Sequence, residues 1–214
     1  MKNIKGIIFD LDGVIVFTDK YHFLAWKAMS DSINTYFDET INNRLRGVSR
    51  MASLDIILER YNGKPLSQEE KEALANKKNE IYRDYLKLMT PKDVSQEVRK
   101  TLKELRNRGY KLAIGSSSKN AKFILERTEL TDYFDAISDG TNISKSKPNP
   151  EVFLKGAEYL GLEPSECAVV EDAYAGIDAA KDGGMLAIAI GDATSYQRSD
   201  DTLTTFIDLL KIFK

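Results

Sequence analysis

The sequence predicts an α/β fold: a Rossmann-like, doubly wound parallel-sheet core with an inserted all-helical cap domain. From Gln96 onward, short apolar strands alternate with helices, which is typical of a parallel sheet covered by helices on both faces. The segment from about Lys20 to Leu88 instead shows helical periodicity and almost no strand signal. An apolar strand, Ile7-Ile8-Phe9, precedes this helical segment, so its partners in the sheet must come from beyond it. We therefore expect a discontinuous core.

The core elements after the first strand can be placed by apolar runs and helical spacing. The predicted strands span 111–116, 136–138, 168–171 and 186–190, and the predicted helices lie near 96–108, 120–129, 150–161 and 174–183. In open α/β sheets, ligands bind at the carboxyl ends of the strands. A binding site is therefore expected where these strands end.

The helical insertion has its own apolar faces. Tyr21, Ala25, Met29 and Ile33 share one helix face, and Leu54, Ile57 and Leu58 fit a second helix. Residues 68–88 form a Lys- and Glu-rich helix with a solvated face. Met89-Thr90-Pro91 is the expected return linker, because proline disfavours helix at the residue before it. The predicted domains are 1–16 with 91–214 for the core and 17–90 for the cap.

Composition excludes several classes of protein. The chain has 214 residues, 42% of them hydrophobic, and a formal net charge of −2, which argues against a general nucleic-acid-binding surface. The sequence shows no apolar run of membrane-spanning length and no signal-peptide pattern. Cys167 is the single cysteine and is expected to pack beside its strand. We expect a cytoplasmic protein, monomeric, without a membrane or nucleic-acid partner.

Acidic and hydroxyl side chains stand at the predicted strand ends. Asp10 and Asp12 follow the first strand, Ser116 ends the second, and Glu171 and Asp172 end the fourth. Closely spaced, desolvated carboxylates need a cation or a proton to be tolerated. An all-oxygen set of Asp10, Glu171 and Asp172 suits Mg²⁺ better than Zn²⁺. For Asp12, a plain turn at the end of the strand is the alternative.

Four segments carry a family resemblance in the same order along the chain. They are Ile8-Phe9-Asp10-Leu11-Asp12-Gly13-Val14-Ile15, Ile114-Gly115-Ser116-Ser117-Ser118, Lys147-Pro148-Asn149-Pro150, and Val169-Val170-Glu171-Asp172 followed by Ala175-Gly176. Together they resemble the motifs of the haloacid dehalogenase superfamily of phosphohydrolases and phosphomutases. The resemblance implies that Asp10 is a nucleophile that becomes an aspartyl phosphate. It also implies that Asp12 is the general acid/base and gives its backbone carbonyl to the metal.

The same resemblance gives roles to residues that contact the phosphoryl group. It implies that Ser116 and Lys147 stabilise the transferring phosphoryl oxygens, as a hydroxyl and an ammonium can. A solvated surface lysine is the alternative for Lys147. We also expect Thr18 in the catalytic set, and Lys78 and Ser117 in the substrate-binding set.

Finer features resemble the β-phosphoglucomutase branch of that superfamily. They are Tyr21-His22-Phe23, Gly47-Val48-Ser49-Arg50 and Ser118-Lys119-Asn120. The resemblance implies that His22 lies near the acid/base aspartate, and that Arg50 with the Ser118–Asn120 segment binds a distal phosphate. The alternatives are a packed histidine, surface charges at Arg46 and Arg50, and simple helix capping by Ser118.

One residue departs from the family pattern. The family usually has an acidic residue where this chain has Phe17. None of the residues assigned to chemistry is lost by this change. It affects the expected hydrogen bonding of the hinge between core and cap.

The expected function is a Mg²⁺-dependent phosphomutase that interconverts β-glucose 1-phosphate and glucose 6-phosphate through a bisphosphate. A sugar-phosphate phosphatase with the same core residues is the nearest alternative. A silent sugar-phosphate sensor would lack at least one of Asp10, Asp12, Lys147 and Asp172, all of which are present. A two-component receiver is disfavoured by the helical insertion and by Asp12.

Overall fold

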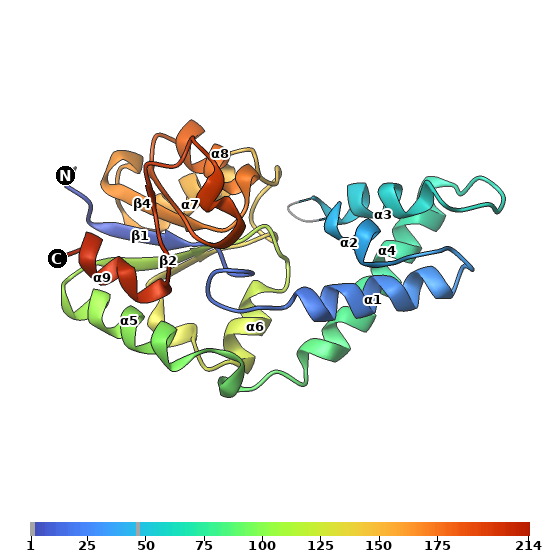
Figure 1. Ribbon diagram of the computed structural model, residues 1–214, viewed down its shortest axis with the longest axis horizontal. Coiled ribbons are helices and arrows are strands. Elements are labelled where there is room, and N and C mark those ends of the chain that lie inside the picture. The colour runs from blue at the N-terminus through green and yellow to red at the C-terminus, as the bar shows by residue number, and fades with distance from the viewer. Residues whose placement is uncertain (1–2, 46–47) are drawn as a thin grey trace. The chain divides into compact units, whose positions relative to one another are not determined.

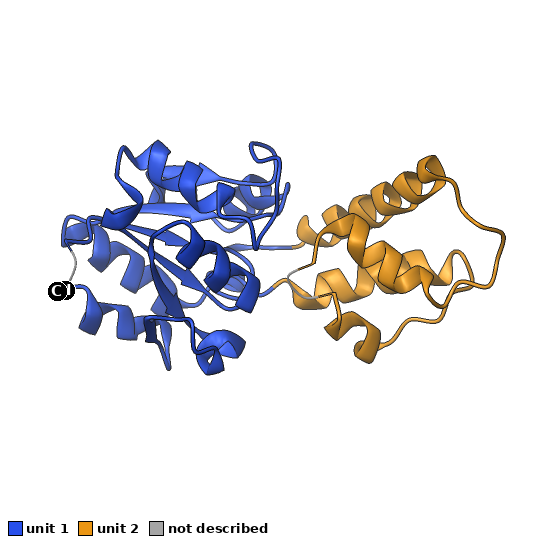
Figure 2. Ribbon diagram, turned by 90° about the horizontal axis from the view of Figure 1, so that it is seen from above, with its two compact units in different colours: residues 1–17, 89–214 blue, residues 18–88 orange. Residues whose placement is uncertain are grey.

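The structure is a computed structural model that describes residues 3–45 and 48–214. The chain divides into two compact units, an α/β unit of Met1–Phe17 with Met89–Lys214 and a helical unit of Thr18–Leu88 (Figure 2). Phe17, Met89 and Thr90 belong to the α/β unit. The first boundary is therefore one residue later than expected, and the second is two residues earlier. Each unit contains its own cluster of buried hydrophobic residues.

The described residues of the α/β unit form a single six-stranded sheet in the order β3-β2-β1-β4-β5-β6, with every neighbouring pair parallel. The strands are β1 (Gly6–Phe9), β2 (Lys111–Gly115), β3 (Ala136–Ser138), β4 (Cys167–Glu171), β5 (Leu186–Ala189) and β6 (Asp201–Thr202). The predicted fold class is confirmed, and the five predicted strands are present. The sequence does not predict the edge strand β6. This strand has only two residues, both exposed, and so it shows no alternation of hydrophobic and polar side chains.

Helices cover both faces of this sheet (Figure 1). They are α5 (Gln96–Asn107), α6 (Ala121–Arg127), α7 (Glu151–Leu160), α8 (Tyr174–Asp182) and α9 (Leu209–Ile212). On one face, Ile8 and Val169 pack against Phe153 of α7 and Ile177 of α8. On the other face, the ring of Phe9 lies 6.2 Å from that of Phe134 and 5.7 Å from that of Phe206. Burying a side chain of this size contributes roughly 1.5–3 kcal/mol, so β1 is held firmly in the middle of the sheet.

The helical unit consists of α1 (Asp19–Asp31), α2 (Glu39–Asn43), α3 (Arg50–Leu58) and α4 (Gln68–Leu86). Tyr21, Ala25 and Met29 form the buried face of α1, as their spacing predicts. Ile33 lies beyond the end of that helix but still packs on the same core cluster. A capping box between Ser67 and Glu70 starts α4, which explains why this helix begins where it does.

No helix among the described residues combines the length and the apolar character needed to cross a membrane. Cys167 is fully buried in β4. Burial raises the pKa of its thiol to about 11, with a smaller contribution from the negative charge of Glu166.

Candidate active site in the α/β unit

The candidate active site lies at the carboxyl ends of three adjacent strands. Asp10 follows β1, Ser116 follows β2, and Glu171 ends β4. Because β1 pairs in parallel with both β2 and β4, these strand ends meet at one edge of the sheet. The backbone N–H of Asp10 donates to the carbonyl of Val170 at 2.9 Å, which extends the β1–β4 pairing to the nucleophile candidate itself.

Three carboxyl groups meet at this edge. One oxygen from each of Asp10, Glu171 and Asp172 lies within 4.8 Å of the others. Asp10 and Glu171 are 7% and 2% exposed. The Lys147 ammonium donates to Asp10 Oδ1 and, at 2.8 Å, to Glu171 Oε2. The structure thus joins four of the residues that the sequence analysis assigned to chemistry, and it excludes a solvated surface position for Lys147, whose side chain is 9% exposed.

Burial and mutual repulsion set the protonation of these groups. Desolvation, with the negative charges of Asp10 and Asp172, raises the pKa of Glu171 to about 8 despite the attraction of Lys147. Desolvation and the charge of Asp10 raise the pKa of Asp172 to about 7, and Asp12 adds to this. Lys147 stays protonated, since the two carboxylates raise its pKa against the effect of burial. A cation would relieve the repulsion among the three acids.

Two glycines leave room for the acidic cluster. A Cβ on Gly13, where φ is +92°, would stand 2.0 Å from Asp172 Oδ2. A Cβ on Gly176 would stand 2.0 Å from the Glu171 carboxyl carbon. Side chains at either position would displace an acid. The glycines of the first and last motifs are therefore explained by close packing against Asp172 and Glu171.

The cluster fits a hard divalent cation. Its donors are carboxylate oxygens from three residues, with neither cysteine nor histidine among them. Such a set suits Mg²⁺, which prefers oxygen ligands and a partly hydrated shell. Asp10, Glu171 and Asp172 are the side chains that could hold such an ion.

The thermal midpoint of the metal-free protein is expected to decrease as the pH is raised from about 7 to about 8.5. The pKa of the Glu171 carboxyl rises from its ordinary value of 4.5 to about 8 on folding, so only the folded state keeps this proton near neutrality. Raising the pH then favours unfolding by about 1 kcal/mol, or roughly 2–4 °C. Differential scanning fluorimetry in chelator measures this slope, and saturating Mg²⁺ should remove it. Glu171→Gln should leave only the smaller slope caused by Asp172, whose pKa is raised to about 7, whereas a rising midpoint in the wild type would contradict the assignment.

The hydroxyl segment after β2 is ordered by the neighbouring strand. The backbone N–H of Ser116 donates to the Ser138 carbonyl at 3.1 Å, and Ser116 Oγ accepts from the N–H of Ser118 at 3.1 Å. Ser118 Oγ accepts from the N–H of Asn120 at 3.2 Å. Asn120, rather than Ser118, occupies the N-cap position of α6. Ser118 therefore does not cap this helix. Asn120 is buried and Lys119 is exposed. Ser117 is partly buried, and its Oγ has no hydrogen-bond partner.

Within the helical unit, the partly buried His22 pairs with the buried Lys78. Lys78 is 3% exposed, and its ammonium lies 2.9 Å from His22 Nδ1. Desolvation, followed by the positive charges of Lys78 and Arg50, holds the pKa of His22 well below 6.5, so the imidazole is neutral and Nδ1 accepts. The ring of Tyr82 lies tilted against that of His22, with ring centroids 4.1 Å apart, and its hydroxyl donates to Thr18 Oγ1 at 3.1 Å. Thr18, His22 and Lys78 therefore belong to one packed group.

The remaining cap residues lie at the start of α3. Ser49 caps this helix by accepting from the N–H of Ala52 at 3.3 Å. Arg50 is partly buried, and its guanidinium donates to Asn79 Oδ1 at 2.8 Å. Val48 is 36% exposed. Arg46 and Gly47 lie outside the described residues.

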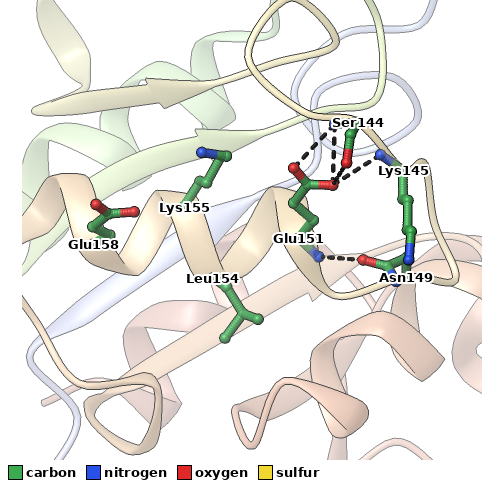
Figure 3. A pocket seen from close by; sticks show the side chains of 7 residues that line it. All are labelled: Ser144, Lys145, Asn149, Glu151, Leu154, Lys155 and Glu158. Atoms are coloured by element: carbon green, nitrogen blue, oxygen red, sulfur yellow. Dashed lines mark hydrogen bonds between the residues drawn. The ribbon is translucent and has the colours of Figure 1, made fainter.

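Sequence reasoning missed Glu151, which binds the loop that carries Lys147. Its carboxylate accepts from the backbone of Ser144 and Lys145 (Figure 3). An acidic residue directly after Pro150 is an ordinary feature of a first helical turn. The local sequence therefore gave no sign that Glu151 binds the loop. The surface hollow of about 360 Å³ along α7 contains Glu151 but neither Asp10 nor Asp172. We therefore identify the candidate active site by its converging charges.

Comparison with known proteins places the chain in a family. Residues 4–184 match the family described as haloacid dehalogenase-like hydrolase. A β-phosphoglucomutase of Bacillus subtilis is 41% identical over 207 residues, covering 96% of this chain and 91% of the relative. A fructose-1-phosphate phosphatase of Escherichia coli is 31% identical over 187 residues, covering 86% and 95%.

A solved structure agrees with this placement. The crystal structure of a β-phosphoglucomutase from Clostridium difficile superposes with a TM-score of 0.88 at 35% identity, covering 96% of this chain and 93% of that one. The matched segment 4–184 contains all four motifs, including the acidic cluster and Lys147. This chain belongs to the haloacid dehalogenase-like hydrolase family of enzymes.

Proposed function

We propose that this enzyme is a Mg²⁺-dependent phosphomutase that interconverts β-D-glucose 1-phosphate and glucose 6-phosphate. The observation that supports it most is the 41% identity with the Bacillus subtilis β-phosphoglucomutase, which extends over 96% of the chain. That extent includes the helical unit, where mutases and phosphatases of one family are expected to differ.

Asp10 is proposed as the nucleophile. One of its carboxylate oxygens attacks phosphorus, and the bond from phosphorus to the sugar oxygen breaks. Asp12 gives its proton to that leaving oxygen, and it accepts a proton from the sugar hydroxyl that attacks the aspartyl phosphate in the reverse step. When that sugar already carries one phosphate, this attack forms the bisphosphate. The bisphosphate then binds in the opposite orientation and returns its other phosphate to Asp10.

Lys147 and Ser116 are proposed to stabilise the transferring phosphoryl group. The Lys147 ammonium already lies against Asp10, and Ser116 is buried at the adjacent strand end. Bound Mg²⁺ supplies further positive charge at the same oxygens. We propose Asp10, Glu171, Asp172 and the backbone carbonyl of Asp12 as its ligands.

A mutase needs a second phosphate site that a phosphatase can lack, since the bisphosphate has a phosphate at each end. We propose Arg50 for it, with Gly47, Val48 and Ser49, which precede it in the sequence, as further substrate-binding residues. In the α/β unit, we propose the Ser118–Asn120 segment as substrate-binding. Partial burial lowers the pKa of Arg50, but an arginine remains charged at neutral pH. A neutral His22 with Lys78 and Thr18 is proposed to set the environment of the acid/base.

A sugar-phosphate phosphatase is the second candidate. The Escherichia coli fructose-1-phosphate phosphatase and a phosphorylated-carbohydrate phosphatase of Thermotoga maritima, 28% identical, support it. In that case water, rather than a sugar hydroxyl, would attack the aspartyl phosphate.

One assay separates the two functions. Purified protein with Mg²⁺, β-glucose 1-phosphate and a hexose bisphosphate primer is followed for glucose 6-phosphate and free phosphate together. We expect glucose 6-phosphate to form with little free phosphate. Stoichiometric release of phosphate without glucose 6-phosphate would favour the phosphatase.

Arg50→Ala is expected to weaken bisphosphate turnover at least tens-fold, since losing one partner of a desolvated charge pair typically costs about 2–5 kcal/mol. Phosphorylation of Asp10 by acetyl phosphate should be spared, because this small donor needs only the core site. Rapid-quench measurement of both reactions checks the difference. Arg60→Ala removes an exposed arginine from the same unit and serves as the control. Equal loss in both reactions would assign Arg50 to folding instead.

A further inference from the structure

The loop that carries Lys147 has little regular structure of its own. Residues 139–150 connect β3 to α7 without a helix or strand, and Ser144, Lys145 and Ser146 are exposed. The Lys147 ammonium nevertheless lies between Asp10 and Glu171, 4.6 Å from the ring centroid of Phe153. A long, flexible side chain from an exposed loop needs its backbone fixed to keep such a position.

Glu151 supplies that fixation (Figure 3). Both of its carboxylate oxygens accept from the N–H of Ser144 at 3.0 Å, and Oε2 also accepts from Ser144 Oγ at 2.8 Å and from the N–H of Lys145 at 2.8 Å. Its own N–H donates to Asn149 Oδ1 at 3.1 Å. Hydrogen bonds to an ionised carboxylate are stronger than neutral ones. The loop is therefore bound on both sides of Lys147.

The anchor behind Glu151 is rigid. The next two residues of α7, Val152 and Phe153, are fully buried in the core cluster that packs on the sheet. The Glu151 carboxylate thus ties the loop to a packed helix at Ser144 and Lys145, three and two residues before Lys147. An acid at a helix start often stabilises the free N–H groups of its own helix. Here the four hydrogen bonds that the carboxylate accepts come from the preceding loop instead.

We propose that Glu151 is a positioning residue that holds Lys147 against Asp10 and Glu171. The inference rests on the catalytic role proposed for Lys147 above. Glu151 itself touches neither the proposed nucleophile nor any proposed metal ligand among the contacts described. Its effect on the reaction is expected to pass through Lys147 alone.

Chemical labelling tests the position of Lys147 without any assay of turnover. The protein is treated briefly with limiting acetic anhydride, and labelling of Lys147 relative to the exposed Lys100 is measured by peptide mass spectrometry. Wild-type Lys147 should label slowly, because it is buried and paired with two carboxylates. Glu151→Ala should raise the ratio several-fold, and Glu151→Gln should raise it less, since one carbonyl acceptor remains. Glu158→Ala, an exposed acid on the same helix, should leave it unchanged.

A double-mutant cycle then tests the link to chemistry. Phosphorylation of Asp10 by acetyl phosphate should slow at least tens-fold in Glu151→Ala, since a displacement near 1 Å can cost about 10²-fold in rate. In a Lys147→Ala background, the same substitution should cause no further loss. Equal losses in both backgrounds would overturn the proposal.

Folding is monitored by the buried Cys167 in β4, which reacts quickly with a thiol reagent only if the core opens. If Glu151→Ala opens the core, the labelling of Lys147 in the Glu151→Gln variant tests the positioning role instead. Wild-type labelling of Lys147 in a folded Glu151 variant would refute the positioning role. Absence of any phosphomutase or phosphatase turnover in the wild type would refute the proposed function, while the labelling result would still stand on its own.

Discussion

Asp10→Asn is expected to abolish turnover, with a loss of at least about 10⁴-fold. The amide has nearly the size of the carboxylate but is a far poorer nucleophile, so no aspartyl phosphate can form at this position. The buried place of Asp10 beside Lys147, at the end of the central strand β1, motivates the assignment. Turnover and the hydroxylamine-sensitive phosphoenzyme, trapped in acid, are the two measurements.

A matched control separates chemistry from charge and folding. Asp132→Asn makes the same change at an exposed residue of the same unit and should behave as wild type. The thermal midpoint of Asp10→Asn should stay close to that of the wild type or rise, because the substitution removes one of three repelling carboxylates. Appreciable turnover by Asp10→Asn in a preparation free of wild-type enzyme would exclude Asp10 as the nucleophile.

Exhaustive chelation is the second change with a large expected effect, and it should reduce turnover to background. Without a cation, burial and mutual repulsion keep Glu171 and Asp172 partly protonated near neutrality, since their pKa values are raised to about 8 and about 7. The site then lacks the positive charge that a transferring phosphoryl group requires. Adding Mg²⁺ should restore turnover, whereas Zn²⁺, which prefers nitrogen and sulfur ligands in tetrahedral sites, should not.

The Mg²⁺ dependence can be assigned to the acidic cluster by titration. Asp172→Asn should raise the Mg²⁺ concentration needed for half-maximal turnover, because it removes one anionic oxygen ligand. Asp132→Asn should not change that concentration. Full activity after chelation, verified by elemental analysis, would refute a metal role.

Much of the α/β unit could be predicted because its strands are short, apolar and followed by polar residues. The convergence of Asp10, Ser116, Glu171 and Asp172 follows from one rule, that parallel strands end at the same edge of a sheet. The metal-type cluster of Asp10, Glu171 and Asp172 is thus predictable from strand ends alone. Their catalytic roles stay predictions until the substitutions are made.

Other features depend on contacts that no local pattern contains. Lysine is rarely buried, so the burial of Lys78 against His22, Trp26 and Tyr82 could not be expected from its place on a charged helix. The four-residue helix α9 is too short to show helical periodicity. The hydrogen bonds that Ser144 and Lys145 donate to Glu151 depend on how the loop folds back, which the spacing of residues in the sequence does not reveal.

The strand order has a consequence for how the protein is made. β1 is synthesised first, yet its partners β2 and β4 begin only at Lys111 and Cys167. On the ribosome the apolar strand β1 therefore stays unpaired until β2 has emerged, and it lacks its second partner until β4 has emerged. Such non-local pairing slows folding and exposes strand edges to aggregation. Among the described residues, by contrast, the hydrophobic cluster of the helical unit consists of residues between Phe23 and Ala75. The part of the chain synthesised next can therefore bury its own core before β1 is paired.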